Sequence, residues 1–194
     1  MKIRHLALTL LSAALLAAAA PLSAGEATDQ IRQTTDKILA VVSDPALKGE
    51  ARAAEREALM RKAVDERFDW QAMSRSAMGS AWRKLTPEQK EEFTRLFSDL
   101  IERTYQAQVE GYSGEKIVYK GESADDKYGT VDVEIITLKG TSIPVTYRVA
   151  KRPAGWLVYD VSVEGVSLVN NYRSQIASIL NRTDYNGLIE KIKK

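Results

Sequence analysis

A strand pattern that leads within a few residues into a helix pattern, over residues 155–175, constrains the fold of this chain more than any other feature. The first part alternates apolar side chains with other residues, as in a half-buried β-strand, at Leu157, Tyr159, Val161 and Val163. From Val169 onward the apolar spacing becomes that of an amphipathic helix. Because a strand and a helix connected so closely must share a hydrophobic core, we expect a fold that mixes sheet and helices.

Four candidate strands follow one another in the second half of the chain, over residues 115–121, 128–138, 142–150 and 156–166. Their consistent apolar residues all have odd numbers, and antiparallel partners that point to the same face have a fixed sum of residue numbers. With short turns between the strands, this rule places Ile135 opposite Val145 and Tyr147 opposite Tyr159. The pattern predicts a meander of about four antiparallel strands with one continuous apolar face.

Helical patterns dominate the first half of the chain. The longest begins at Thr86-Pro87, where Thr86 and Gln89 can form a capping box, and its apolar stripe continues over about six turns to Gly111. Shorter helices are predicted over residues 26–42, 44–68, 68–82 and 184–194. The sequence therefore predicts an α+β fold, in which an antiparallel sheet packs against several helices.

Residues 1–24 have the pattern of a secretory signal peptide. Basic residues precede an apolar run over residues 6–20, and small residues follow up to Ala24. We therefore expect cleavage after Ala24 and export of the chain. The remaining residues, 25–194, are enough for one domain with a sizeable core.

Composition excludes several classes of active site. The sequence has no Cys, and its one His, His5, lies in the predicted signal peptide. Nucleophilic sites of the Ser-His-Asp or Cys-His type, zinc sites built from His or Cys, and disulfides are therefore excluded from the mature chain. The full chain has 28 basic and 26 acidic residues, and the predicted signal peptide holds two of the basic ones, which leaves 26 of each. A neutral chain is not typical of nucleic-acid-binding proteins, so no nucleic-acid partner is predicted.

Two sequence blocks, in a specific order and spacing over residues 65–192, carry a family resemblance. The first runs from Phe68-Asp-Trp through Trp82-Arg-Lys-Leu-Thr-Pro-Glu-Gln to Tyr112-Ser-Gly-Glu-Lys. The second runs from Gly155-Trp-Leu-Val-Tyr-Asp to Asn171-Tyr-Arg-Ser, and is followed by Asp184 and by Gly187-Leu-Ile. Together they resemble the MlaC family, the phospholipid-shuttle proteins of the periplasm that are also known as toluene-tolerance or ABC-transporter auxiliary components.

The resemblance implies a cone-shaped fold in which a curved antiparallel sheet and surrounding helices enclose a deep apolar pocket for lipid acyl chains. It implies a monomeric periplasmic carrier, not an enzyme, that needs no cofactor and holds phospholipid as its cargo. The partners it implies are an outer-membrane lipoprotein–porin complex and an inner-membrane ABC transporter with an MCE subunit. Transfer of lipid between them would maintain the lipid asymmetry of the outer membrane.

If the interior is partly hollow, its lining should come from the apolar face of the sheet and the facing stripe of the longest helix. The residues we expect there are Val131, Val133, Ile135, Ile143, Val145, Tyr147 and Val149 from the sheet, and Phe97, Ile101 and Tyr105 from the helix. The alternative is that these residues form an ordinary packed core. A carrier needs no catalytic group, because an apolar pocket alone removes most of the cost of moving a tail of about sixteen carbons through water, on the order of 10 kcal/mol.

Two other functions are compatible with the residues. One is a carrier of a different apolar cargo, such as a hopanoid or a solvent. The other is an isomerase of cone-shaped fold in which Asp160 acts as a general base. Asp160 and Glu164 share a face of the last strand and Arg173 follows within reach, so a structural ion pair is the simpler interpretation of these charges.

Overall fold

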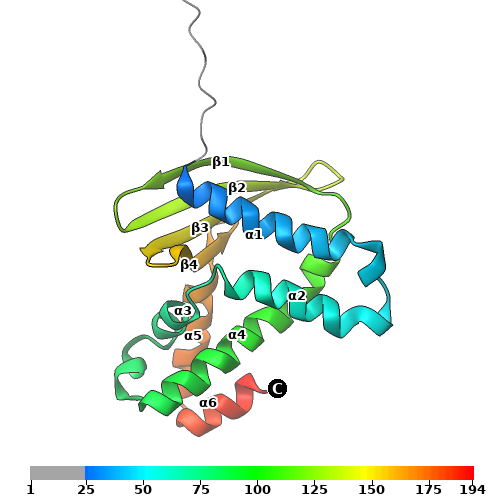
Figure 1. Ribbon diagram of the computed structural model, residues 1–194. Helices are drawn as coiled ribbons and strands as arrows, with labels where there is room; N and C mark the ends of the chain where they lie inside the picture. Colours follow the sequence, from blue (N-terminus) through cyan, green and yellow to red (C-terminus); the bar gives the residue numbers. More distant parts are fainter. Residues whose placement is uncertain (1–24) are drawn as a thin grey trace, which may run out of the picture.

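A five-stranded antiparallel sheet forms one layer of the protein, and helices form the other (Figure 1). The computed structural model describes residues 25–194, so the predicted signal peptide lies outside the described residues. The strands follow the chain order and are β1 (Lys116–Ala124), β2 (Tyr128–Ile136), β3 (Ser142–Arg152), β4 (Gly155–Val163) and β5 (Val166–Ser167). The predicted α+β fold and meander are confirmed, and the two-residue β5 is an addition to them.

The helices are α1 (Glu26–Ser43), α2 (Ala53–Asp65), α3 (Trp70–Met78), α4 (Pro87–Glu110), α5 (Leu168–Leu180) and α6 (Tyr185–Ile192). The capping box that starts α4 is present: Gln89 N–H donates to Thr86 Oγ1 at 3.2 Å, and Thr86 N–H donates to Gln89 Oε1 at 3.0 Å. None of the helices within residues 25–194 combines the length and the apolar character that crossing a bilayer requires.

The single helix predicted over residues 44–68 is wrong in its first part. Asp44 Oδ1 accepts a hydrogen bond from Ala46 N–H at 2.8 Å and caps only a short 3₁₀ turn, Pro45–Leu47. A second 3₁₀ turn, Glu50–Arg52, follows Gly49, whose φ of +89° interrupts any helix. α2 therefore begins only at Ala53.

The register between β2 and β3 differs from the predicted one by two residues. Ile135 lies opposite Ile143, and Val133 lies opposite Val145. The ladder ends at Ile136, and the next five residues form the loop, in which Gly140 N–H donates to Thr137 O at 2.9 Å. Because the shift is an even number, the odd-numbered residues of both strands still share one face, as expected.

Partway along β4, the residues that point toward the core change from even-numbered to odd-numbered ones. Val149 of β3 pairs with Val158 and Arg148 pairs with Asp160, so Tyr159 is an extra, unpaired residue in a β-bulge. Before the bulge the even-numbered Trp156 and Val158 are buried, and Leu157 and Tyr159 do not have the inward position that alternation predicts. Beyond the bulge the odd-numbered residues of β4 return to the inner face, where Tyr147 lies opposite Val161 rather than Tyr159.

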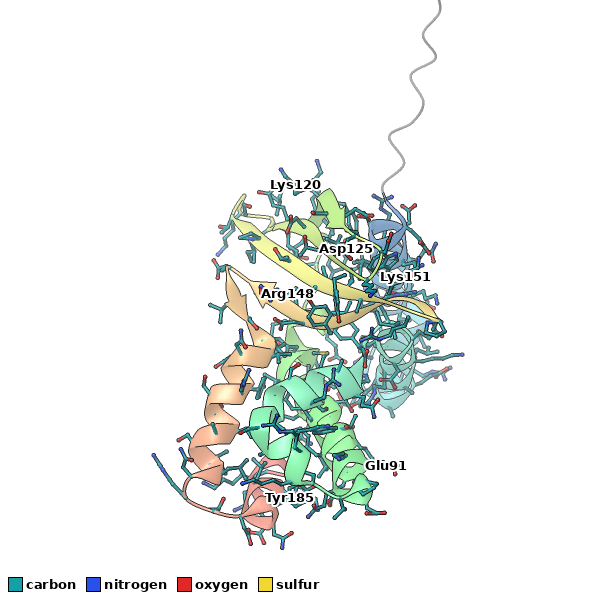
Figure 2. All side chains as sticks on the ribbon, turned by 90° about the vertical axis from the view of Figure 1, so that its left-hand side faces the viewer. Glu91, Lys120, Asp125, Arg148, Lys151 and Tyr185 are labelled. Carbon is teal, nitrogen blue, oxygen red and sulfur yellow. The ribbon has the colours of Figure 1, made fainter. Side chains whose placement is uncertain are left out.

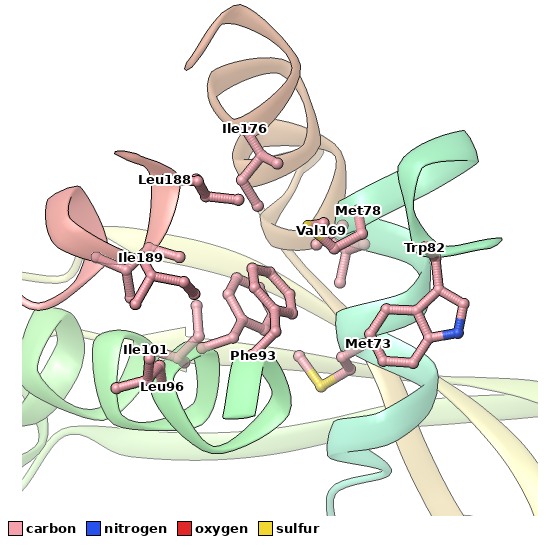
Figure 3. Close-up of a cluster of buried hydrophobic side chains, with 13 residues drawn as sticks. Met73, Met78, Trp82, Phe93, Leu96, Ile101, Val169, Ile176, Leu188 and Ile189 are labelled. Atoms are coloured by element: carbon pink, nitrogen blue, oxygen red, sulfur yellow. The ribbon is translucent and has the colours of Figure 1, made fainter. Parts of the chain in front are cut away.

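Two hydrophobic clusters hold the layers together. In the sheet cluster, α1 packs across the inner face of the sheet with Ala27 and Ile31 against valines of β2 and β3 and against Trp156 and Val158. In the helical cluster, α3, α4, α5 and α6 enclose a core that includes Phe93, Ile176 and Leu188 (Figure 3). Figure 2 shows Arg148 and Lys151 on the sheet layer and Tyr185 at the opposite, helical end of the molecule.

Candidate functional site

An apolar cavity of about 280 Å³ lies between the two clusters. Its wall comes from one side of α1, from α2 and α4, from the middle of β3 and from the end of β4. Phe68, Trp70 at the start of α3 and Leu168 at the start of α5 complete it. The cavity is partly open to solvent and its lining surface is almost entirely apolar. Tyr105, Val109 and Val163 on the wall are exposed to 36%, 36% and 38%, so they mark the mouth.

The size of the cavity suits a hydrocarbon chain. An engineered apolar cavity of about 150 Å³ in another protein stays dry and binds benzene. The present cavity has nearly twice that volume, so it has room for roughly a dozen carbon atoms. Burial of each methylene is worth about 0.8 kcal/mol, which gives such a chain on the order of 10 kcal/mol of favourable transfer free energy.

The structure brings three of the ten candidate lining residues together on the cavity wall: Ile101 and Tyr105 of α4, and Tyr147 of β3. The other candidates from the sheet belong to the sheet cluster, where α1 covers them: Val131, Val133, Ile135, Ile143, Val145 and Val149. Phe97 is fully buried in the helical cluster. The sheet therefore contributes to the cavity through Tyr147 of β3 and through Val161 and Val163 of β4.

Several wall residues were not singled out from the sequence. Ile31, Thr34, Thr35 and Ile38 of α1 face the cavity, together with Met60 and Val64 of α2. Their helical spacing indicates a buried face but does not distinguish a packed face from a cavity wall. The hydroxyl groups of Thr34 and Thr35 donate to the backbone oxygens of Gln30 and Ile31, at 3.2 and 3.0 Å, so these polar atoms are satisfied within the helix.

Arg61 is one of three charged residues on the wall, with Arg67 and Glu102. Its guanidinium donates to Asp99 at 2.9 Å, to Glu102 at 2.6 Å and to Asp65 at 2.9 Å, and its Nη2 also donates to Ser98 Oγ at 2.8 Å. Burial on its own lowers the pKa of Arg61, but the hydrogen bonds to Asp99, Glu102 and Asp65 outweigh it and raise the pKa above its ordinary value. The network holds α2 against α4 while the apolar stem lines the cavity.

We expect Arg61→Gln to lower the free energy of unfolding by about 1 to 3 kcal/mol, because Asp99 and Glu102 lose a charged partner at a site of restricted solvent access. Urea unfolding followed by circular dichroism measures this change. Arg95→Gln is the matched control, because Arg95 pairs with the same Asp99 at 3.7 Å but its side chain is 62% exposed. Equal, small effects of the two substitutions would show that the network contributes nothing beyond a surface ion pair.

Tyr147 brings a phenol group to the sheet side of the cavity wall. It forms no hydrogen bond with any residue between 25 and 194. Burial, with a smaller contribution from Tyr119, raises the pKa of Tyr147 to about 12, so the group stays neutral. The side chain can therefore line an apolar cavity without placing a charge in it.

Asp160 does not line the cavity. Its carboxylate accepts a hydrogen bond from Ser167 Oγ at 2.6 Å and another from Val169 N–H at 3.1 Å, which together fix the junction between β4 and α5. No ion pair joins Arg173 to Asp160 or to Glu164 in the part of the chain that the structure describes. Asp160 thus stabilises this junction and is not one of the residues that line the cavity.

Comparisons with known proteins relate the chain to lipid-binding proteins. A family model described as "MlaC protein" matches residues 32–194. The chain is 30% identical over 122 residues to the intermembrane phospholipid transport system binding protein MlaC of Haemophilus influenzae, covering 60% of this chain. It is 28% identical over 116 residues to the toluene tolerance protein Ttg2D of Pseudomonas putida, covering 59% of this chain. These matches span 57% and 54% of the length of the two relatives.

A solved structure with the same fold holds a ligand. The phospholipid-binding protein from Ralstonia solanacearum, determined in complex with a phospholipid, superposes with a TM-score of 0.78 at 28% sequence identity. The match covers 87% of this chain and 96% of the other. The cavity and the two hydrophobic clusters thus belong to a fold that has been observed with a lipid bound.

Proposed function

Because this chain belongs to the MlaC family, we propose that it is a phospholipid carrier whose cavity between α1, α2 and α4 takes up an acyl chain. The observation that supports this most is the apolar cavity of about 280 Å³ in a fold that a phospholipid-binding relative shares. In this proposal the protein performs no reaction and needs no metal or other cofactor.

The acyl chain would enter past Tyr105, Val109 and Val163, and contact Ile101 and Tyr147 further along the wall. Its methylenes exchange water for an apolar wall, which offsets most of the cost of leaving the membrane. The headgroup stays at the mouth, where water solvates it, because the arginines on the wall already donate to protein acceptors: Arg61 to carboxylates, and Arg67 to uncharged oxygens. Carriage of the lipid then follows from partitioning alone.

The proposal extends to the setting in which the carrier works. Residues 1–24 would direct export and be removed, leaving residues 25–194 as one lipid-binding domain in the periplasm. The carrier, as a monomer, would exchange lipid with an outer-membrane lipoprotein–porin complex and with an inner-membrane ABC transporter that bears an MCE subunit. Its cycle would contribute to the lipid asymmetry of the outer membrane.

A transfer assay tests the function. Donor vesicles contain a phospholipid with a pyrene-labelled acyl chain, acceptor vesicles do not, and excimer fluorescence reports the movement of the label. We expect the transfer rate to rise in proportion to the concentration of the mature protein. Unchanged rates, together with a hopanoid as the only lipid extracted from the purified protein, would contradict phospholipid carriage and favour another apolar cargo.

Removal of the cargo is expected to lower the melting temperature by roughly 5 to 10 °C. A ligand present at about a hundred times its dissociation constant stabilises the folded state by about 2.7 kcal/mol, and a domain of this size shifts by roughly 2 to 4 °C per kcal/mol. Differential scanning calorimetry of lipid-loaded and delipidated protein measures the shift. Adding phospholipid back should restore the higher value; identical melting curves would show that the cavity holds no stabilising ligand.

A further inference from the structure

A second pocket, separate from the apolar cavity, lies between α3 and the turn that joins β3 to β4. It has a volume of about 240 Å³ and mostly polar lining groups, contributed by Asp69, Gln71, Ala72, Arg75, Trp82 and Arg152. The segment that enters α3 divides the two spaces: Phe68 and Trp70 line the apolar cavity, and the intervening Asp69 lines the polar pocket. The rings of Phe68 and Trp70 stack at a centroid distance of 5.3 Å and form part of that partition.

The charges in this pocket do not balance. The Asp69 carboxylate is engaged on both oxygens, since Oδ2 accepts from Arg152 Nε at 3.0 Å and Oδ1 accepts from Ala72 N–H at 2.9 Å. Arg75 forms no ion pair or side-chain hydrogen bond with any residue of the described range. The formal charge of the lining is therefore +1, and the guanidinium of Arg75 is free to bind a ligand.

Trp82 adds a donor without an acceptor, an indole N–H that solvent reaches. The residue is only 8% exposed, yet its indole N–H has no hydrogen-bond acceptor among residues 25–194. In contrast, the indole of Trp70 donates to Asp65 at 2.7 Å and that of Trp156 donates to Glu26 at 3.3 Å. Figure 3 shows the indole nitrogen of Trp82 on the side of the ring that faces away from the helical cluster. The polar pocket that Trp82 lines lies outside this cluster.

The first turn of α3 borders another side of the pocket. Gln71 and Ala72 are the second and third residues of this nine-residue helix. N–H groups at a helix N-terminus carry partial positive charge and favour anions. Asp69 Oδ1 already caps this helix start by accepting from Ala72 N–H. The free donors around the pocket are therefore the guanidinium of Arg75 and the indole N–H of Trp82.

We propose that this pocket binds a phosphate-type oxyanion, supplied either as free phosphate or as the phosphate of a lipid headgroup at a membrane surface. Guanidinium groups form paired hydrogen bonds with phosphate oxygens. A tetrahedral ion can accept from several directions at once, which suits donors on separate elements, whereas a carboxylate has only two oxygens. The site does not depend on the apolar cavity, so it stands whether or not the chain carries lipid.

The indole N–H of Trp82 gives a specific signal for the test. In ¹H–¹⁵N spectra of the full chain at constant ionic strength, we expect inorganic phosphate to shift the Trp82 indole resonance to saturation and to leave those of Trp70 and Trp156 in place. Arg75→Gln should weaken the dissociation constant at least tenfold, the usual loss for a charged hydrogen bond. Arg182→Gln, an exposed arginine on the turn before α6, should leave it unchanged.

The two sources of phosphate are separated by a sedimentation assay with vesicles. If the ligand is a lipid headgroup, vesicles of phosphatidylglycerol should retain the protein and Arg75→Gln should release it. If it is the free ion, phosphate alone shifts the resonance and vesicles do not retain the protein. The proposal is overturned if neither source shifts the Trp82 signal, if Arg75→Gln responds like the wild type, or if acetate binds as tightly as phosphate.

Discussion

Val161→Trp is expected to reduce the phospholipid that co-purifies with the protein to less than a fifth of the wild-type amount. Val161 lies on the cavity wall where β4 returns its odd-numbered residues to the inner face, opposite Tyr147. An indole at this position projects into the space that the acyl chain would occupy, and strands accept aromatic residues readily. Organic extraction followed by mass spectrometry measures the molar ratio of lipid to protein.

Thr146→Trp is the matched control for that substitution. Thr146 has nearly the shape of valine and belongs to the neighbouring strand. Its side chain lies on the outer face of the sheet, where the hydroxyl donates a hydrogen bond to Asp132 Oδ1 at 2.7 Å. We expect this variant to keep its full lipid content and a similar circular dichroism spectrum. Equal lipid content in both variants would contradict the assignment of this cavity as the lipid site.

Phe97→Ala is expected to lower the free energy of unfolding by about 3 to 5 kcal/mol, the usual cost of removing a fully buried phenyl ring. Phe97 is 0% exposed, stacks on Phe93 at 5.6 Å between ring centroids and meets Tyr172 edge-on at 5.5 Å. The change corresponds to a fall in melting temperature of roughly 10 °C for a domain of this size. Thermal and urea unfolding of delipidated protein measure it.

Tyr105→Ala is the comparison for Phe97→Ala, because it removes a side chain from the cavity wall instead of from the packed core. Tyr105 lies on the same helix but at the mouth, where it is 36% exposed, so its removal should cost the delipidated protein less than about 1.5 kcal/mol. In the lipid-loaded protein Phe97→Ala should still lower the free energy of unfolding more than Tyr105→Ala does, because Phe97 has no contact with the cavity. A small effect of Phe97→Ala would mean that this ring borders an open space.

Much of the architecture can be predicted from the sequence, because local signals specify it. The capping box at Thr86 fixes the start of α4, and the apolar stripe that follows predicts its full length to Glu110. The shared odd parity of apolar residues in β2 and β3 gives their common face correctly. These signals depend on residues that are close in the chain, so they can be recognised without knowledge of the tertiary structure.

The candidate site is harder to predict from the sequence, because it depends on which helices and strands cover one another. Alternation along β4 gives no sign of the bulge at Tyr159, although that one residue reverses the faces of Trp156 and Leu157. The apolar face of β2 and β3 looks equally suitable as a core or as a wall. α1 decides between the two by packing Ala27 and Ile31 onto it, which leaves Tyr147 of β3 on the cavity wall.

A crystal structure of the protein as purified, without delipidation, tests most directly whether hydrocarbon occupies the space between the two clusters. We expect continuous, tube-shaped electron density that begins near Tyr105 and Val163 and passes Ile101 and Tyr147, with a headgroup outside the mouth. Side chains of α1, α2 and α4 that meet across this space at the packing density of a protein interior, and leave no volume for a chain of carbons, would contradict the carrier function.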